Sequence, residues 1–286
     1  MTGTETRASV VVPAHNEAAV IGRLLTALVA DARPGEFDIV VVPNGCTDDT
    51  AAIARSFGES VTVVETPVAN KHHALRLGDR HAGHHPRVYV DGDVVLDAAA
   101  VRHLADALSE PGVLAAAPAR RLNMTGRALV VRWYYRVWEL LPSVREGLYG
   151  RGVVAIAEGG HQRIAEMPEA MGDDLAASVA FAPTERRVVE EAVVEVHPPR
   201  TTRDLIKRRV RSLTATAQMR EISPEHTDQA RTSRADLVRL TRGQPALLPH
   251  VAVFLAVTVI ARLKARKPVR EGDFSTWLRD ESSRTA

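Results

Sequence analysis

Short valine-rich runs alternate with helix-like segments in the first third of this chain, and this alternation restricts the folds open to it. Val10-Val11-Val12 and Val40-Val41-Val42 are continuous apolar runs that end at Pro13 and Pro43. The segment between them carries apolar residues at helical spacing: Val20, Ile21, Leu24, Leu25 and Leu28. Strands separated by such helices predict βαβ units and a parallel sheet. Because the runs are continuous rather than alternating, both faces of the strands should be buried.

The same pattern predicts an α/β fold in which helices flank a mostly parallel sheet, followed by a C-terminal helical region. We expect one domain over residues 1–200 and the helical region over 201–286. Strands are predicted at 8–13, 37–43, 61–64, 87–90, 113–117, 152–157 and 188–196, and helices at 18–30, 48–57, 71–81, 99–108, 126–141 and 174–180.

Polar residues follow three of the predicted strands at the point where each strand ends. They are Pro13-Ala14-His15-Asn16-Glu17, Asn44-Gly45-Cys46-Thr47-Asp48-Asp49 and Asp91-Gly92-Asp93. Sheets of this type bind ligands beyond the carboxyl ends of their strands. The three loops therefore predict one site. Within the first loop, Asn16 is also expected to cap the following helix, with Glu17 near its positive end.

Asp91 and Asp93 aim two carboxylates at one place, separated only by a glycine. Two like charges at this distance repel, and a bound cation relieves the repulsion. Mg²⁺ and Mn²⁺ prefer one or two carboxylates together with phosphate oxygens. The alternative is an ordinary Asp-Gly turn.

Taken together, the motifs resemble the family 2 inverting glycosyltransferases, which have the nucleotide-sugar (GT-A) fold. The resemblance runs from about Ser9 to Arg211 and includes a fourth segment, Asn70 to Gly78. It implies a GT-A-like sheet, a nucleoside-diphosphate sugar as donor, and Mg²⁺ or Mn²⁺ as cofactor.

The resemblance also implies roles for single residues. Pro13, Ala14 and Glu17 would line the base and ribose, Asp48 keeps its family match, and Lys71 would reach toward the phosphates. Asn44 stands where the family usually has Asp, so it keeps an acceptor for a base N–H but loses the charge. Asp91 and Gly92 would face the nucleotide, and Asp93, with Asp91, the metal.

Asp174, in Gly172-Asp173-Asp174-Leu175, resembles the aspartate of the family's Glu-Asp motif and would be the catalytic base. Attack by an acceptor hydroxyl releases a proton, which a positioned carboxylate can take. Helix capping is the alternative. Arg208 to Ser212 resembles the Gln-Arg-x-Arg-Trp motif of processive members, with Arg208 and Ser212 departing from it. Arg209 or Arg211 would then contact the diphosphate, or else belong to a solvated basic face.

Four aromatic residues and two histidines also invite more than one interpretation. Trp133, Tyr134, Tyr135 and Trp138 would form core or stack on a sugar or apolar acceptor, and Tyr134 and Trp138 share a helical face. His161 falls where acceptor-side loops of the family lie. His197, beyond the last predicted strand, would join the metal ligands.

Leu247–Ala261 is strongly apolar and is followed by Arg262, Lys264, Arg266, Lys267 and Arg270. Fifteen residues are fewer than the roughly 20 needed to span a bilayer. The interpretations left open are a core helix, a homo-oligomer contact, and peripheral contact of 247–270 with an anionic membrane.

Composition adds little about partners, because the net charge of +2 over 286 residues favours no nucleic-acid partner. A single cysteine, Cys46, and an N-terminus without a long apolar run indicate a cytoplasmic protein, with the inner membrane face as the possible peripheral site. We therefore predict a metal-dependent inverting glycosyltransferase acting on a small-molecule or lipid-linked acceptor. The alternatives are a catalytically silent nucleotide-sugar-binding protein and a sugar-phosphate nucleotidyltransferase.

Overall fold

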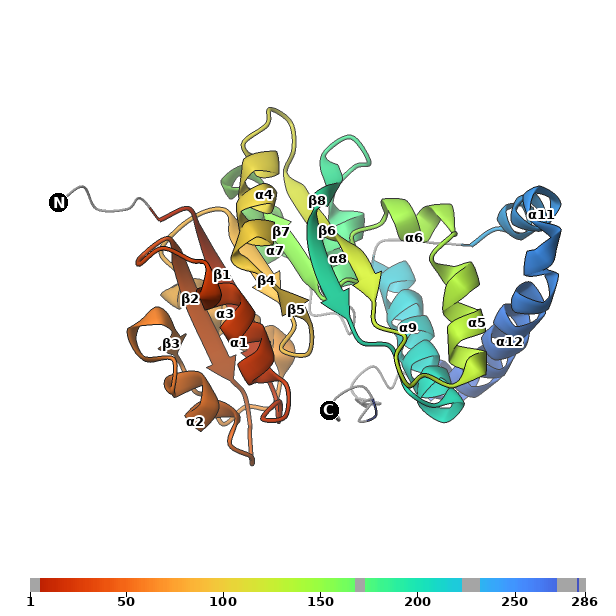
Figure 1. Ribbon diagram of the computed structural model, residues 1–286, viewed down its shortest axis with the longest axis horizontal. Coiled ribbons are helices and arrows are strands. Elements are labelled where there is room, and N and C mark those ends of the chain that lie inside the picture. The colour runs from red at the N-terminus through yellow and green to blue at the C-terminus, as the bar shows by residue number, and fades with distance from the viewer. Residues whose placement is uncertain (1–5, 168–172, 223–231, 272–281, 283–286) are drawn as a thin grey trace.

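A computed structural model of the chain describes residues 6–167, 173–222, 232–271 and 282. Its helices and strands follow one another in the order shown in Figure 1. They are β1 (Ala8–Ala14), α1 (Ile21–Ala30), β2 (Phe37–Pro43), α2 (Thr50–Arg55), η1 (Gly58–Ser60), β3 (Thr62–Val63), α3 (Lys71–His81), β4 (Arg87–Val90), β5 (Val95–Leu96), α4 (Ala98–Leu108), β6 (Ala115–Leu122), α5 (Leu129–Trp138), α6 (Pro142–Glu146), β7 (Val153–Ile156), α7 (Glu158–Ala165), α8 (Asp173–Ala180), β8 (Arg186–Val196), α9 (Thr202–Ile222), α11 (Arg234–Gly243), η3 (Pro245–Leu247) and α12 (Leu248–Glu271).

One sheet with the strand order β3-β2-β1-β4-β7-β6-β8-β5 forms the centre of the molecule. The pairs among β3, β2, β1 and β4 are parallel, as the alternation predicts, and β6 also runs parallel to β8. Strand β7 is antiparallel to both β4 and β6. The α/β prediction with a mostly parallel sheet is therefore confirmed, with the antiparallel β7 joining its two parallel parts.

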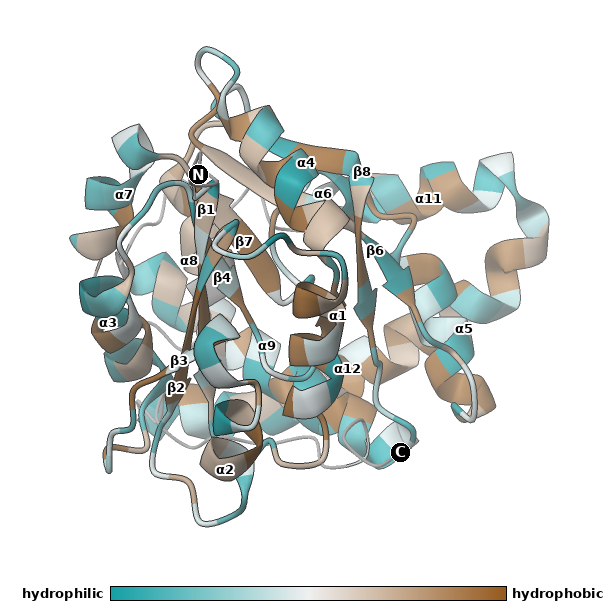
Figure 2. Ribbon diagram, turned by 60° about the vertical axis from the view of Figure 1, so that its left-hand side comes forward, coloured by the Kyte–Doolittle hydropathy of each residue, from teal (hydrophilic) through white to brown (hydrophobic). Residues whose placement is uncertain are grey.

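Helices cover both faces of the sheet, and the valine runs supply apolar side chains to each face. Val10 and Val12 pack with the inner side of α1, including Leu24 and Leu28. Val11 points to the other face, where Ala74 of α3 packs. All of these side chains are fully buried, so the continuous valine runs do mark strands covered on both sides. The hydropathy colouring in Figure 2 shows the brown residues on the strands and on the inner side of α1.

A second core lies among α5, α9 and α12, at the end of the molecule opposite β1–β3 (Figure 1). Tyr134 of α5 is fully buried there, with its ring stacked 5.0 Å from that of Phe254 of α12. Helix α5 belongs to the first 200 residues, so the C-terminal helices share a core with that part of the chain. The division at residue 200 stays a proposal about domains.

Several element boundaries differ from the sequence prediction, and two of the differences have identifiable reasons. The helix predicted at 126–141 ends at Trp138, and Pro142 begins α6, because proline cannot continue a helix. The strand predicted at 113–117 is shifted to Ala115–Leu122. Its polar end, which includes Arg120 and Arg121, is held by parallel pairing with β8, from Ala119↔Val193 to Leu122↔Val196.

The apolar C-terminal segment is longer than the fifteen residues considered in the sequence. Residues 245–271 form 27 helical residues, which suffice in length and composition to cross a membrane, and a third (33%) of the most apolar window is buried. The expectation that this segment is too short to span a bilayer was therefore wrong. The basic residues that follow Ala261 continue the same helix, because lysine and arginine are good helix formers.

Candidate functional site

The register of the parallel strands brings their carboxyl ends to the same edge of the sheet. Ala14 pairs with Pro43 at the ends of β1 and β2. Val11 pairs with Tyr89, so Asp91, two residues further on, is level with Pro13. The three polar loops thus meet at one edge, as the sequence predicts.

Asn44 joins the first two loops from a buried position in which its side chain is only 2% exposed. Its Nδ2 donates hydrogen bonds to the carbonyl oxygens of Ala14 at 2.9 Å and Val42 at 3.3 Å. Both neighbours are carbonyl oxygens, which fixes the orientation of the amide. The carbonyl oxygen of Asn44 in turn lies 2.6 Å from Nδ1 of His15. The amide nitrogen of Asn44 therefore holds β1 and β2 together, a role that a carboxylate could not fill.

Asn16 adopts the left-handed backbone region, with φ of 51°. Its Oδ1 accepts a hydrogen bond from the backbone N–H of Thr47 at 2.8 Å. Helix α1 begins only at Ile21, and its N-cap residue, Val20, makes no side-chain capping bond. The predicted capping role of Asn16 was therefore wrong, and the side chain instead ties the first loop to the second.

Glu17 and Asp48 are held by the same small network at the start of α2. The N–H of Glu17 donates to Oγ1 of Thr50 at 2.8 Å, and the N–H of Ala18 donates to Oδ2 of Asp48 at 3.1 Å. Burial raises the pKa of Asp48, but hydrogen bonds from Thr50 and from the N–H of Ala18 outweigh it, so the net pKa is lowered. Asp48 is thus kept ionised, and its carboxylate accepts hydrogen bonds from both loops.

The acidic loop lies against both the first loop and α3. Nζ of Lys71, at the first position of α3, forms an ion pair with Oδ1 of Asp91. A Cβ on Gly92 would lie 3.3 Å from Cγ of Glu17, so this glycine allows the two loops to approach closely. A guanidinium nitrogen of Arg23 lies 3.4 Å from the carbonyl oxygen of Asp93. The structure therefore brings Glu17, Lys71 and the acidic loop together.

Gly152, just before β7, completes this edge from the second half of the chain, a contact that no sequence pattern indicates. The N–H of Asp91 donates to the carbonyl oxygen of Gly152 at 2.7 Å. Gly152 has φ of 68°, and a Cβ there would lie 2.6 Å from Val94 and 3.3 Å from Oδ2 of Asp91. Only glycine fits without displacing the Asp91 carboxylate.

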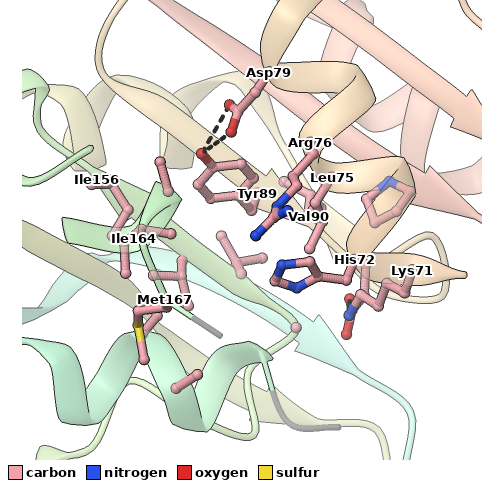
Figure 3. A pocket seen from close by; sticks show the side chains of 18 residues that line it. Lys71, His72, Leu75, Arg76, Asp79, Tyr89, Val90, Ile156, Ile164 and Met167 are labelled. Atoms are coloured by element: carbon pink, nitrogen blue, oxygen red, sulfur yellow. Dashed lines mark hydrogen bonds and ion pairs between the residues drawn. The ribbon is translucent and has the colours of Figure 1, made fainter. Parts of the chain in front are cut away.

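A pocket opens beside Asp91 and runs between α3, β4, β7, α7 and α8 (Figure 3). Pro13, Lys71 and Asp91 lie at one end, together with His72, and mostly apolar side chains such as Leu75, Ile156 and Ile164 continue it. At the other end the hydroxyl of Tyr89 donates to Asp79 at 2.9 Å, as the dashed lines in Figure 3 show. Polar side chains thus lie at both ends of the pocket, with mostly apolar ones between them.

His161, predicted on the acceptor side, does not line this pocket but contacts Asp79, which does. Its Nε2 is 3.3 Å from Oδ2 of Asp79, and its ring meets that of His85 edge-on. Burial raises the pKa of Tyr89, and the Asp79 charge adds to this effect. His161 therefore belongs to a half-buried polar cluster with Asp79 and Tyr89.

Helix α8 borders the same pocket through Ala176 and Ala177. Asp174 lies in the first turn of α8, two residues before Ala176. The side chain of Asp174 and the preceding Gly172 lie outside the described part of the chain, so the position of the carboxylate stays a prediction.

His197 follows the end of β8 and is half-buried. Its Nε2 lies 3.4 Å from Oε1 of Glu195 and 3.5 Å from Nδ2 of Asn123. Burial lowers the pKa of His197, and the charge of Arg23 lowers it further, while Glu195 and Asp93 act in the opposite direction. The lowered pKa favours the neutral imidazole, which is the form that binds metals.

The aromatic cluster and Arg209 lie in the second core. Tyr134 and Tyr135 are buried, which favours the core interpretation over sugar stacking. Trp138 is partly exposed and stacks under the guanidinium of Arg120 at 4.6 Å. The guanidinium of Arg209 lies 5.8 Å from the ring of Tyr134. Arg211 lies on the same helix, α9, and is half-buried.

Asp91 and Asp93 suit a small divalent cation by their chemistry. Among the described residues, no three His, Cys, Asp or Glu side chains converge as a metal site. Mg²⁺ is commonly held by one or two carboxylates, with the remaining ligands from phosphates and water. The ion pair with Lys71 holds the Asp91 carboxylate at this edge, where it can serve as such a ligand.

The parallel β3-β2-β1-β4 unit, with acidic and basic side chains at its carboxyl edge, defines a GT-A-type α/β protein. The sequence profile of "Glycosyl transferase family 2" matches residues 9–159, which is more than half of the chain. The chain belongs to this family.

Relatives of known activity match over shorter or more divergent stretches. The 4,4'-diaponeurosporenoate glycosyltransferase of Staphylococcus aureus is 36% identical over 90 residues, which are 30% of this chain and 24% of that protein. The match thus spans about a quarter of the length of this curated relative.

Solved structures show the same fold. The mannosyltransferase PcManGT of Pyrobaculum calidifontis, in complex with GDP-Man and Mn²⁺, has a TM-score of 0.65 at 19% identity, covering 92% of this chain and 88% of its own. Glucosyl-3-phosphoglycerate synthase of Mycobacterium tuberculosis has a TM-score of 0.56 at 22% identity, covering 75% and 79%. At these identities the likeness establishes the GT-A fold.

Proposed function

We propose that this chain is a metal-dependent inverting glycosyltransferase that moves a sugar from a nucleoside-diphosphate sugar to an acceptor hydroxyl. The observation that carries the proposal is the meeting of three strand-end loops and α3 around Asp91. Membership of family 2 supports the activity, and the GT-A neighbours bound to GDP-Man and Mn²⁺ support the donor and metal.

The nucleoside would bind along the first two loops. Pro13, Ala14 and Glu17 would line the base and ribose, with Asp48 fixing the loop. The Nδ2 of Asn44 is committed to backbone carbonyls, so its Oδ1 is the atom left to accept a base N–H. The donor's base would therefore meet an uncharged acceptor rather than a carboxylate.

The diphosphate would lie over Asp91, Gly92 and Lys71. Lys71 pairs with Asp91 and would shift its ammonium group toward phosphate when the donor binds. A cation held by Asp93 and Asp91 would neutralise charge on the leaving nucleoside diphosphate. His197 is a candidate further ligand, and contact of Arg209 or Arg211 with the diphosphate remains part of the proposal.

Asp174 would take the proton from the acceptor hydroxyl. Its helix, α8, borders the pocket that also contains Asp91, which supports a role for Asp174 on the acceptor side of the donor. A base of this kind contributes roughly 10²–10⁴-fold to the rate. Attack opposite the leaving group inverts the anomeric configuration.

Removal of the metal-binding carboxylate tests the central claim. We expect Asp93→Asn to abolish Mn²⁺-dependent transfer or donor hydrolysis, while Asp106→Asn, at an exposed ion pair with Arg7, keeps it. Donors are first found by thermal shift with UDP-, GDP- and TDP-sugars, with and without Mn²⁺. Full activity of the Asp93 variant in the presence of metal would refute the proposal.

Product analysis separates the alternatives. Release of a nucleoside diphosphate supports a glycosyltransferase, whereas release of pyrophosphate identifies a nucleotidyltransferase. Tight donor binding without turnover on a broad acceptor panel identifies a silent binding protein. An NMR assignment of the product's anomeric configuration tests inversion, and retention would exclude Asp174 as the base of a single displacement.

The acceptor and the cellular location are part of the same proposal. We expect a small-molecule or lipid-linked hydroxyl as acceptor and a reducing, cytoplasmic setting, in which Cys46 stays a thiol.

A further inference from the structure

The outward side of α12 carries a row of apolar side chains with no described protein against them. Five of these are large and between 41% and 58% exposed. They are Leu248, Leu255, Val259, Ile260 and Leu263. At 100° per residue they fall on one side of the helix, opposite the buried row Val251, Phe254, Val257, Ala261 and Ala265. We call the five exposed residues the apolar row.

Basic side chains follow directly along the same helix. Arg262, Lys264, Arg266, Lys267 and Arg270 are all exposed. The α12 segment from Leu248 to Ala261 carries no charged residue, and the turns after it carry five positive charges before the first acid, Glu271. An exposed apolar row followed by a cationic cluster matches the two parts of an anionic lipid surface, acyl chains and headgroups.

From this pairing we infer that α12 docks the protein in the plane of an anionic membrane. The apolar row enters the boundary between headgroups and acyl chains, and the basic cluster contacts lipid phosphates. The inference does not depend on the proposed transfer reaction, because it rests on exposure and charge at the end of the molecule opposite β1–β3 (Figure 1).

The buried side of α12 argues against a helix that crosses the bilayer. Val251 and Phe254 pack in the second core with Leu205 of α9 and Tyr134 of α5. Ala261 and Ala265 pack against Val210, also on α9. Helix α9 carries Lys207, Arg208, Arg209 and Arg211 alongside. A crossing helix would have to leave these partners or draw their charges into hydrocarbon, whereas docking in plane leaves the second core intact.

The charge also argues against a second copy of the chain as the occupant. In a symmetric contact through this side of α12, the five cations of each copy would lie against the other copy's cations or against its apolar row, and no acid from Leu248 to Arg270 would pair with them. An anionic lipid surface instead complements the whole length of the helix.

Vesicle co-sedimentation of the full chain tests the inference, with phosphatidylcholine vesicles containing or lacking phosphatidylglycerol. We expect binding to the anionic vesicles that weakens in high salt. Leu255→Ser with Val259→Ser should lower the partition coefficient about tenfold or more, since buried apolar area contributes to binding. Lys264→Glu with Lys267→Glu should lower it by about tenfold or more through charge.

Matched control variants distinguish an effect of α12 from the general effect of losing exposed apolar side chains or positive charges. Val68→Ser with Val193→Ser removes two exposed valines elsewhere, and Arg33→Glu with Arg80→Glu makes the same charge change near α1 and α3. Both controls should bind like the unaltered protein. All variants change exposed side chains, so circular dichroism should show unchanged folding.

Four results would overturn the inference. The unaltered chain could stay in the supernatant with anionic vesicles, or the apolar variant could bind as well as its control. Sedimentation velocity could show a dimer that Leu255→Ser with Val259→Ser dissociates, without vesicle binding, which would assign the surface to a second copy. If the chain stayed in cell membranes after carbonate extraction, α12 would be a spanning helix instead.

Discussion

Replacing Asn44 by the acid that family 2 usually has at this position should destabilise the protein, although the change is nearly isosteric. Asn44→Asp removes two hydrogen bonds, those from Nδ2 to the carbonyl oxygens of Ala14 and Val42. Each is worth about 1 kcal/mol, and the buried carboxylate would face two carbonyl oxygens. Protonation of the new acid lets it donate to one of them, so its pKa should rise in the folded state.

The loss should therefore depend on pH in a defined direction. When the pKa of an acid is raised in the folded state, the free energy of unfolding is highest below the unfolded pKa, which is about 3.9 for Asp. It then falls as the pH rises from the unfolded to the folded pKa. The slope is about 1.4 kcal/mol per pH unit until the folded pKa is reached. From pH 5.0 to pH 7.5 the variant should lose up to about 3.4 kcal/mol relative to the unaltered protein.

Urea unfolding of both proteins at the two pH values measures this difference. Asn70→Asp is the matched control, because Oδ1 of Asn70 accepts from the N–H of His73 at 2.8 Å as the N-cap of α3. A carboxylate keeps that bond and suits a helix N-terminus, so the control should lose nothing. An Asn44→Asp protein as stable as the control at pH 7.5 would refute the structural role of the amide.

Two further predictions follow from glycine packing and from a buried ion pair. Gly152→Ala should raise the KM for donor and lower stability by roughly 1–3 kcal/mol, because the new Cβ meets Val94 and the Asp91 carboxylate. Steady-state kinetics compare it with Gly112→Ala, which has φ of 84° but nothing within 4 Å, and equal donor KM values would contradict the reasoning. The hydrogen bond from Arg102 is the largest effect on Glu36 and lowers its pKa to about 2, so Glu36 contributes stability above about pH 4.5 that is lost as the pH falls through about 2. Glu36→Gln should lose up to about 3 kcal/mol at pH 7 and much less at pH 2.5 in urea unfolding, and a pH-independent loss would contradict the assigned cause.

The parallel half of the fold and its loops could be predicted because local signals there agree with the tertiary structure. Valine runs, turn residues and helical spacing all gave the same elements, and α3 and β4 have the predicted bounds. The strand ends then meet by the geometry of parallel pairing alone. The clustering of Glu17, Lys71 and Asp91 therefore followed from the order of the elements.

The contributions of Gly152 and Arg23 could not be predicted, because each depends on a contact between distant parts of the chain. Gly152 reaches Asp91 only through the antiparallel pairing of β4 and β7. The apolar run that begins at Val153 predicts a strand, but it does not indicate whether that strand runs parallel or antiparallel to β4. The capping role given to Asn16 was wrong for a related reason. Its side chain has a partner 31 residues away, and a local cap was the only partner that sequence spacing could suggest.

The reversed strand β7 beside the site also has a consequence for how such a protein can diversify. Beside the site, the two halves of the sheet adjoin through the short β4–β7 ladder of four residue pairs, from Arg87↔Ile156 to Val90↔Val153. Side chains beyond this seam can change without altering the register of β1, β2 and β4, provided that a glycine stays beside Asp91. Evolution or engineering could thus exchange the second half of the chain for another and leave the loops around Asp91 unchanged.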